Sequence, residues 1–289
     1  MLAVAALTAA APPAAQAQSA GSHARITNVP CNTTALANAI TAANTVPATL
    51  RLAGSCVYLL NAALPQITGK VTLVGGPSTS IKRNPIVPNL RVLDVAATGT
   101  LRVDGIFILN GGTTTSVGGG IRNAGTLVLN FVTLSGNTAT ANNGGGLHNT
   151  GVAVLVRTHL AANSNQGPGG DGGGIYNDGT LTLLESRLTG NVATRNGGGI
   201  YTTAGHTTRV IQSSISGNSA ANLGGGLYNL GTTSLDRSVV ALNQAVGNNT
   251  AGGGIFNAAV GGVTLSRSSV TKNSPDNCQP LNSILGCAG

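Results

Sequence analysis

A glycine triplet returns six times in this chain at nearly constant spacing. GGG occupies residues 118–120, 144–146, 172–174, 197–199, 224–226 and 252–254, so neighbouring copies start 25 to 28 residues apart. Each triplet is followed by Ile or Leu, then two residues later by Asn or Thr, and a further Asn closes the unit. A period of this length indicates a solenoid, because one such unit cannot bury its own apolar face but stacked copies can.

The apolar residues keep fixed distances from the closing Asn, and these distances predict strands. Three positions before it stand Leu134, Leu160, Leu188, Ile215, Val240 and Val270, and eight before it Leu129, Leu155, Leu183, Val210, Leu235 and Leu265. Side chains that alternate with a period of two belong to strands, and the change of phase between the two sets requires a bend six to seven residues before the Asn. Each repeat is therefore expected to hold about three short strands.

The fold class that follows is all-β, a single-stranded right-handed parallel β-helix of about 25–28 residues per rung. The right hand is chosen because parallel crossovers are almost always right-handed. Stacking would place like residues about 4.8 Å apart, so that aliphatic side chains form core ladders. The two Asn of each unit would bond to their counterparts along the stack. The glycine triplet would supply turn backbone without side-chain crowding.

Composition agrees with a narrow core and says little about partners. The chain has 43 Gly, three Phe, four Tyr and no Trp, whereas 41% of its residues are apolar. The formal net charge is +8, but no run of basic residues stands out. We interpret this charge as a weak field that favours anionic surfaces, or as a contribution to solubility alone, and we expect no nucleic-acid partner.

The two ends of the chain predict export and capping. Residues 1–17 end in the small-x-small pattern of a signal peptide, with a disordered Ala-rich tail as the alternative. We expect an N-terminal cap over residues 31–60, the β-helix over 61–277 and a C-terminal cap over 278–289. In the first cap, Leu36, Ala39, Ile40 and Ala43 follow helical spacing after Thr33 and Thr34, which predicts a short capping helix.

The predicted location is secreted or extracellular, without membrane insertion. The apolar stretch at the start is too short to span a bilayer and is broken by Pro12 and Pro13. We expect no anchor or second domain after Gly289, and this expectation disfavours a purely structural module of a larger surface protein. The oligomeric state is left open.

Four cysteines allow three pairings, and the predicted stack selects one. Cys31 and Cys56 fall at one end of roughly eight rungs, and Cys278 and Cys287 fall at the other. Disulfides need Cα atoms within about 7 Å, which excludes pairing between ends that lie about 40 Å apart. We therefore predict Cys31–Cys56 and Cys278–Cys287.

These motifs resemble the right-handed parallel β-helix repeat proteins of the wider pectate-lyase-like superfamily. The GGG-I-x-N element with a later S-x-x-x-G-N, at 186–191 and 213–218, is similar to the repeats of polymorphic outer-membrane proteins, although the aromatic residue of those repeats is absent here. The segments CNTTALANAITAAN and SPDNCQPLNSILGCAG look like end pieces of secreted bacterial members. The resemblance implies fold and export, and leaves activity open between lyases, glycosidases and adhesins.

The titratable residues do not predict an active site. Calcium-dependent lyases of this fold need clustered carboxylates, but none of the seven acids is adjacent to another in the sequence. Glu185 is expected to pair with Arg157 on the outer surface instead. His148, His159 and His206 stand at different repeat positions, so they do not predict a metal site. We expect no catalytic residue, metal or cofactor.

One outward column is the candidate ligand-binding site. The residue after each GGG-Ile/Leu lies between two inward positions, and the six are Arg122, His148, Tyr176, Tyr201, Tyr228 and Phe256. The flat rings could stack against an extended sugar, with Arg122 and His148 preferring an anionic one, or they could simply stack on each other. The turns at 164–171 and 244–251 could wall one side of the column.

Two functions remain open at this point. The leading hypothesis is a non-catalytic secreted protein that displays a surface for glycan or cell-surface binding, with an extracellular or cell-wall polysaccharide as partner. The alternative is a polysaccharide lyase or glycosidase of the pectate-lyase-like superfamily.

Overall fold

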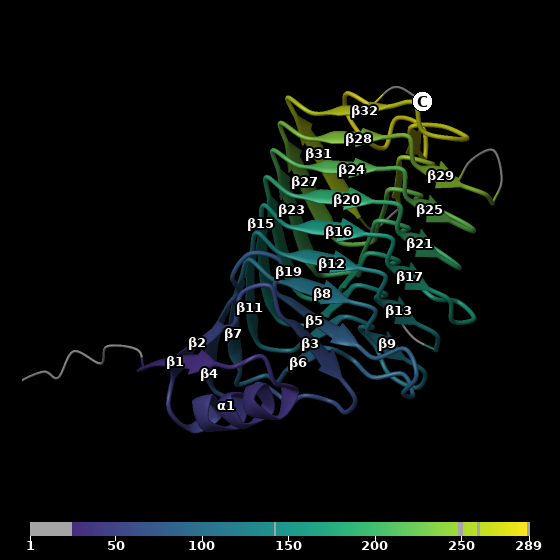
Figure 1. Ribbon diagram of the computed structural model, residues 1–289. Coiled ribbons are helices and arrows are strands. Elements are labelled where there is room, and N and C mark those ends of the chain that lie inside the picture. The colour runs from purple at the N-terminus through teal and green to yellow at the C-terminus, as the bar shows by residue number, and fades with distance from the viewer. Residues whose placement is uncertain (1–24, 142, 248–250, 259–260, 288–289) are drawn as a thin grey trace, which may run out of the picture.

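The chain coils into a parallel β-helix, seen from the side in Figure 1. A computed structural model describes residues 25–141, 143–247, 251–258 and 261–287; the signal peptide predicted for residues 1–17 lies outside them. Every strand pair within the four sheets is parallel, and the sheets run along the axis of the stack as its sides. The longest sheet contains ten strands, so the solenoid has about ten turns.

We name the four sheets A to D. Sheet A consists of β1 (Arg25–Val29), β2 (Ala48–Leu52), β4 (Lys70–Val74), β7 (Thr100–Asp104), β11 (Thr126–Asn130), β15 (Val152–Val156), β19 (Thr180–Leu184), β23 (Thr207–Ile211), β27 (Thr232–Asp236) and β31 (Gly262–Ser266). Sheet B consists of β3 (Val57–Leu60), β5 (Ser80–Arg83), β8 (Phe107–Leu109), β12 (Thr133–Ser135), β16 (His159–Ala161), β20 (Arg187–Thr189), β24 (Ser214–Ser216), β28 (Val239–Ala241) and β32 (Ser269–Thr271). Sheet C consists of β6 (Leu93–Val95), β10 (Ile121–Asn123), β14 (Leu147–Asn149), β18 (Ile175–Asn177), β22 (Ile200–Thr202), β26 (Leu227–Asn229), β30 (Ile255–Asn257) and β33 (Cys278–Gln279). Sheet D consists of β9 (Gly112–Thr113), β13 (Thr138–Ala139), β17 (Ser164–Asn165), β21 (Val192–Ala193), β25 (Ser219–Ala220) and β29 (Gln244–Ala245).

Each complete coil passes through sheets C, A, B and D in that order. In β19, Leu181 and Leu183 are fully buried, while Thr180 is exposed and Thr182 is half-buried. The alternation therefore points the predicted ladders inward, and the same phase holds along sheet A. The predicted fold class is confirmed: an all-β parallel β-helix with one short helix near its N-terminus.

Two details of the prediction were wrong. Each coil has four strands rather than three. The fourth is a two-residue strand of sheet D, formed by the pair of residues that directly follows the closing Asn. Strands that short carry no readable period. The number of turns is about ten rather than eight, because the entry rungs around β2, β4 and β7 lack the glycine triplet by which the repeats were counted.

Glycine is required at the first and at the second position of the triplet for two different steric reasons. The first glycine has positive φ in all six copies, for example +67° at Gly197, a conformation that strains other residues. A Cβ added to the second glycine would clash with backbone, since at Gly198 it would lie 2.3 Å from the carbonyl oxygen of Ser219 and 2.5 Å from that of Gly225. The turn between sheets D and C therefore packs backbone against backbone.

The bend between sheets A and B is built on a left-handed residue in each rung. Six residues before the closing Asn, φ lies between +46° and +51° at Phe131, Arg157, Glu185, Gln212, Arg237 and Arg267. The bend predicted at this point is thus confirmed. These six residues define the A–B corner of the solenoid.

The closing Asn residues form a continuous ladder that is buried from Asn137 to Asn243 and ends in the half-buried Asn273 and Asn277. Each side-chain Nδ2 donates to the Oδ1 of the next residue in the series at 2.8–3.1 Å, and the series is Asn137, Asn163, Asn191, Asn218, Asn243, Asn273 and Asn277. The second ladder, in sheet C, is interrupted where Thr202 replaces Asn. There Asn177 donates to the hydroxyl of Thr208, which also bonds to Thr202.

Helix α1 (Thr33–Thr45) covers the N-terminal end of the core (Figure 1). Leu36 and Ile40 are fully buried against it, as the spacing predicted. The capping residue is Asn32 rather than a threonine, because its side-chain oxygen accepts from the backbone N–H of Ala35 at 2.9 Å.

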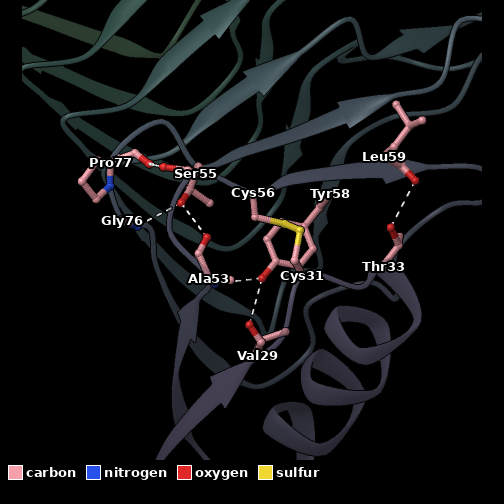
Figure 2. The surroundings of a disulfide bond; sticks show 11 residues. Val29, Cys31, Thr33, Ala53, Ser55, Cys56, Tyr58, Leu59, Gly76 and Pro77 are labelled. Carbon is pink, nitrogen blue, oxygen red and sulfur yellow. Dashed lines mark hydrogen bonds between the residues drawn. A yellow bond between two sulfur atoms is a disulfide. The ribbon is translucent and has the colours of Figure 1, made fainter.

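A disulfide joins the chain before α1 to the edge of sheet B (Figure 2). Cys31 and Cys56 are bonded, with Cα atoms 5.7 Å apart. Beside them the buried hydroxyl of Tyr58 donates to the carbonyl oxygen of Val29 and accepts from the N–H of Ala53. These bonds tie the first strand of sheet A to the cap.

The second predicted disulfide, Cys278–Cys287, closes the other end. Cys278 lies in β33, the last strand of sheet C, and Ile284 is buried with the core residues of the final rungs. Both pairings predicted from the sequence are therefore present.

Candidate functional site

The six predicted ligand-binding residues form one column on the outer face of sheet C. We call this column the aromatic stripe: Arg122, His148, Tyr176, Tyr201, Tyr228 and Phe256. Each is the middle residue of a three-residue strand, and the residues on either side of it point into the core. The register places each directly opposite its neighbour on the next rung.

The rings of the stripe stack on one another. Successive ring centroids from His148 to Phe256 are 4.9–5.3 Å apart, with interplanar angles between 2° and 8°. Only 9% of His148 and 8% of Tyr201 is exposed. Of the two arrangements expected from the sequence, the rings adopt the one in which they stack on each other. Parallel strands lie about 4.8 Å apart, which leaves no room for a sugar between two stacked rings.

The Arg122 end of the stripe contains a carboxylate and a buried, neutral histidine. Asp94 occupies the same column one rung earlier, and its carboxylate bonds to Arg122 at 3.3 Å and to Arg91 at 2.9 Å. Burial is the main cause that lowers the pKa of His148 to about 4, so the ring is neutral at pH 7. The expected preference for an acidic sugar therefore loses the charge of His148, and it keeps an Arg122 that shares Asp94 with Arg91. Aligning Leu93–Val95 with the later rungs would have revealed Asp94.

A polar column lies beside the tyrosines, formed by the residues just before three glycine triplets. The N–H of Asp171 donates to the Oδ1 of Asn143, and the N–H of Asn196 donates to the Oδ1 of Asp171, each at 3.1 Å. Asp171 is only 1% exposed and is paired with Arg195. Its charge is therefore buried but compensated.

The polar column acts on the tyrosine hydroxyls. Burial is the largest cause that raises the pKa of Tyr176, Tyr201 and Tyr228 above the usual value, and the carboxylate of Asp171 adds to it. Tyr176 also hydrogen-bonds to the side chain of Asn143. The hydroxyls are therefore protonated at neutral pH, and each can both donate and accept a hydrogen bond.

The two turns predicted to lie along one side of the stripe, at 164–171 and 244–251, agree only in part with the structure. The segment 164–171 begins with β17 and leaves sheet D only after Asn165, where it leads to Asp171. The segment 244–251 likewise begins with β29, and residues 248–250 lie outside the described part. The Asp171–Arg195 pair had no sequence signal, because the two residues stand at different distances from their triplets.

The remaining titratable residues mostly have surface partners. Glu185 pairs with Arg157 at 2.6 Å, as predicted. His159 bonds to the hydroxyl of Thr189, and His206 lies 3.2 Å from a carboxylate oxygen of Asp178. Within residues 25–141, 143–247, 251–258 and 261–287, no three His, Cys, Asp or Glu side chains gather closely enough to hold a metal ion.

The comparisons with known proteins give one match. Residues 185–203 match the Chlamydia polymorphic membrane protein repeat, and this segment runs from the A–B corner at Glu185 through one glycine triplet. Neither the curated proteins nor the solved structures contain a match. The one helix among the described residues, α1, is shorter than a bilayer span requires. Together with the fold, the match supports a β-helix repeat protein.

Proposed function

We propose that this chain is an extracellular, surface-displayed β-helix repeat protein that binds a glycan or another cell-surface polymer without catalysing a reaction. The similarity of residues 185–203 to a membrane-protein repeat supports surface display. The two disulfides support an oxidising location outside the cytosol. The signal peptide expected in residues 1–17 belongs to the same proposal.

The observation that carries the binding proposal is the row of tyrosine hydroxyls along the stripe. Tyr176, Tyr201 and Tyr228 repeat one hydroxyl per rung, about 4.8 Å apart, on a stacked and rigid base. Asp171 and Arg195 lie close enough to act on these hydroxyls electrostatically. A polymer laid along the axis would bind through hydrogen bonds to the ring edges, because the ring faces cover each other.

No observation on the described residues favours the alternative, a polysaccharide lyase or glycosidase. Hydrolysis of a glycosidic bond by two carboxylates requires both groups to flank that bond in one cleft. Here Asp94, Asp171 and Glu185 each bond to arginine, and they lie in different parts of the coil. The proposed function is therefore binding rather than turnover.

A glycan array on three proteins tests the proposal. The variant Tyr176→Phe/Tyr201→Phe/Tyr228→Phe keeps the stacked rings and removes only the hydroxyls. The matched control Thr126→Val/Thr180→Val/Thr232→Val removes three exposed hydroxyls from sheet A. We expect binding by the wild type and the control, and loss of binding by the phenylalanine variant, with all three folded by circular dichroism. Absence of wild-type binding, or binding unchanged in the phenylalanine variant, would refute the proposal.

A further inference from the structure

Five arginines lie at the A–B corner or within three residues of it, one on each of five consecutive rungs. Arg157, Arg237 and Arg267 are corner residues themselves, whereas Arg187 lies on β20 of sheet B and Arg209 on β23 of sheet A. The corner residues follow each other along the axis, because the backbone N–H of each donates to the residue before the next corner. We call these five arginines the arginine ridge.

The ridge has an excess of positive charge at the surface. The neighbouring acids are Glu185, paired with Arg157, and Asp236, which Arg237 and Arg267 share at 3.0 Å each. The side chains of these three arginines are 49%, 49% and 69% exposed. Five arginines against two carboxylates leave a net charge of +3.

Two members of the ridge are uncommitted. Among the described residues, the side chains of Arg187 and Arg209 form no ion pair, and both are exposed. Arg187 is close enough to His159 to contribute to the lowering of that residue's pKa, after burial. Their guanidinium groups are therefore available to an external anion.

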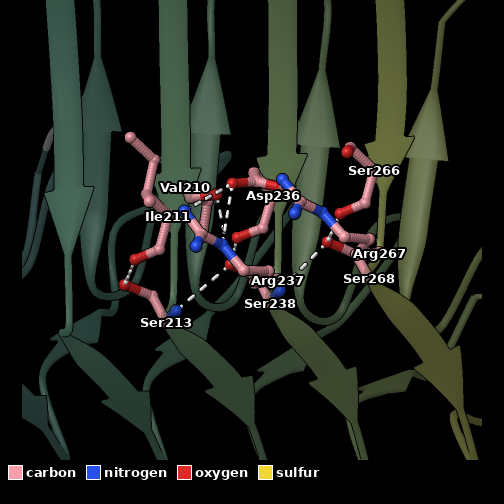
Figure 3. A network of polar contacts seen from close by, with 9 residues as sticks. All are labelled: Val210, Ile211, Ser213, Asp236, Arg237, Ser238, Ser266, Arg267 and Ser268. Carbon is pink, nitrogen blue, oxygen red and sulfur yellow. Dashed lines mark hydrogen bonds and ion pairs between the residues drawn. The ribbon is translucent and has the colours of Figure 1, made fainter.

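The backbone beneath the ridge is locked in place (Figure 3). The hydroxyls of Ser213, Ser238 and Ser268 bond back to carbonyl oxygens two residues earlier, at 2.7–2.9 Å. The N–H groups of Ser213 and Ser238 donate to the serine hydroxyl of the next rung. In Figure 3, Asp236 lies between Arg237 and Arg267 and orients both guanidinium groups. The side chains held in this way therefore lose less conformational entropy when a ligand binds.

We propose that the arginine ridge binds a linear glycan carrying sulfate or carboxylate groups, laid parallel to the axis of the solenoid. The cations follow one another over four rung steps, about 19 Å, at positions from three residues before the corner to two residues after it. Guanidinium groups bind planar oxyanions through two parallel hydrogen bonds. The outward residues between them include the hydroxyl groups of Ser214, Ser234 and Ser266, which can bond to sugar hydroxyls.

Two features favour a glycan over other polyanions. Rings are few near the ridge: from Arg157 to Arg267 the described outer surface of sheets A and B has one aromatic side chain, His159, and Phe131 at the preceding corner lies against the guanidinium of Arg157 at 5.1 Å. Single-stranded nucleic acids bind by stacking on several successive rings. The ridge also bends around a rigid corner between sheets A and B, which suits an extended chain better than a flat lipid surface. The ridge lies on the A–B corner and the stripe on sheet C. A negative binding result at one site therefore leaves the proposal for the other site intact.

Binding to immobilised heparin tests the ridge with a matched pair of variants. Arg187→Gln/Arg209→Gln removes the two uncommitted cations of the ridge. Arg51→Gln/Lys70→Gln removes two exposed cations at the N-terminal end, so the net charge is the same in both variants. We expect heparin affinity to fall about tenfold in the ridge variant and to change less than about twofold in the control. Raised salt should weaken wild-type binding steeply.

The same measurement with other surfaces decides the class of ligand. We expect little binding to neutral dextran, and weaker binding than to heparin for a single-stranded oligonucleotide and for phosphatidylglycerol vesicles. Equal losses in the two variants would mean that net charge alone attracts the polymer. That result, absence of heparin binding, or tighter binding of the oligonucleotide or the vesicles would overturn the proposal.

Discussion

Replacing one buried asparagine of the closing ladder tests how the solenoid is held together. Asn191 lies in the middle of the stack and is fully buried. Its Oδ1 accepts from the backbone N–H and from Nδ2 of Asn163, each at 3.0 Å. Its Nδ2 donates to Oδ1 of Asn218 and to the carbonyl oxygen of Leu160. One side chain therefore joins three rungs.

The expected loss of stability follows from the hydrogen-bonding groups that Asn191→Ala leaves unpaired. The N–H of Asn163 loses its acceptor in a site that is closed to solvent, whereas Nδ2 of Asn163 keeps the carbonyl oxygen of Leu134. A buried donor without a partner costs about 1–3 kcal/mol, and a lost internal hydrogen bond about 1 kcal/mol. We expect a total loss of about 3–4 kcal/mol in the free energy of unfolding.

The same substitution at the end of the ladder serves as the control. Asn273 occupies the last coil and is only half-buried, so water can replace its bonds. We expect Asn273→Ala to cost about 1 kcal/mol. Guanidinium chloride unfolding followed by far-ultraviolet circular dichroism gives both values from the shift in midpoint. Equal shifts, or a shift below about 1 kcal/mol for Asn191→Ala, would show that the ladder does not stabilise the stack.

Three further predictions concern core phase, backbone strain and pH. Leu183→Asp should abolish folding or lower stability by several kcal/mol, because this side chain lies in the core. Thr182→Asp should change stability by only about 0.5 kcal/mol, because its side chain lies outside the core. Equal thermal shifts for the two variants would contradict this prediction. Leu242→Gly should raise stability by about 1 kcal/mol in thermal unfolding, since Leu242 is exposed at a φ of +59° where three other rungs have glycine; a lower melting temperature would contradict it. The pKa of His148, lowered to about 4 chiefly by burial, means that the unfolded state binds more protons below pH 6.5. Stability that is fully present at pH 7 should therefore be lost as pH falls toward 4, by about 3 kcal/mol, and His148→Tyr should remove this part of the pH dependence in parallel denaturation series.

The sequence by itself determined the strand phase, the core and the disulfides. Leu183 and its counterparts recur at one position in six copies, and stacking leaves only one face of each strand to bury them. The pairing of Cys31 with Cys56 followed from the length of the stack alone. Such conclusions depend on positions along one coil, which a repeating pattern specifies.

The tertiary structure decided what the surface offers to a ligand. Whether the ring of Tyr201 is open or covered depends on the distance between rungs and on the polar column beside it, neither of which one repeat encodes. Arg187 and Arg209 stand at different repeat positions and belong to one ridge only because the A–B corner brings sheets A and B together. Asp94 pairs with Arg122 of the next rung and with Arg91 at the same time. Contacts between side chains of different rungs depend on how the coil bends, which is why sequence periodicity locates the column but not its chemistry.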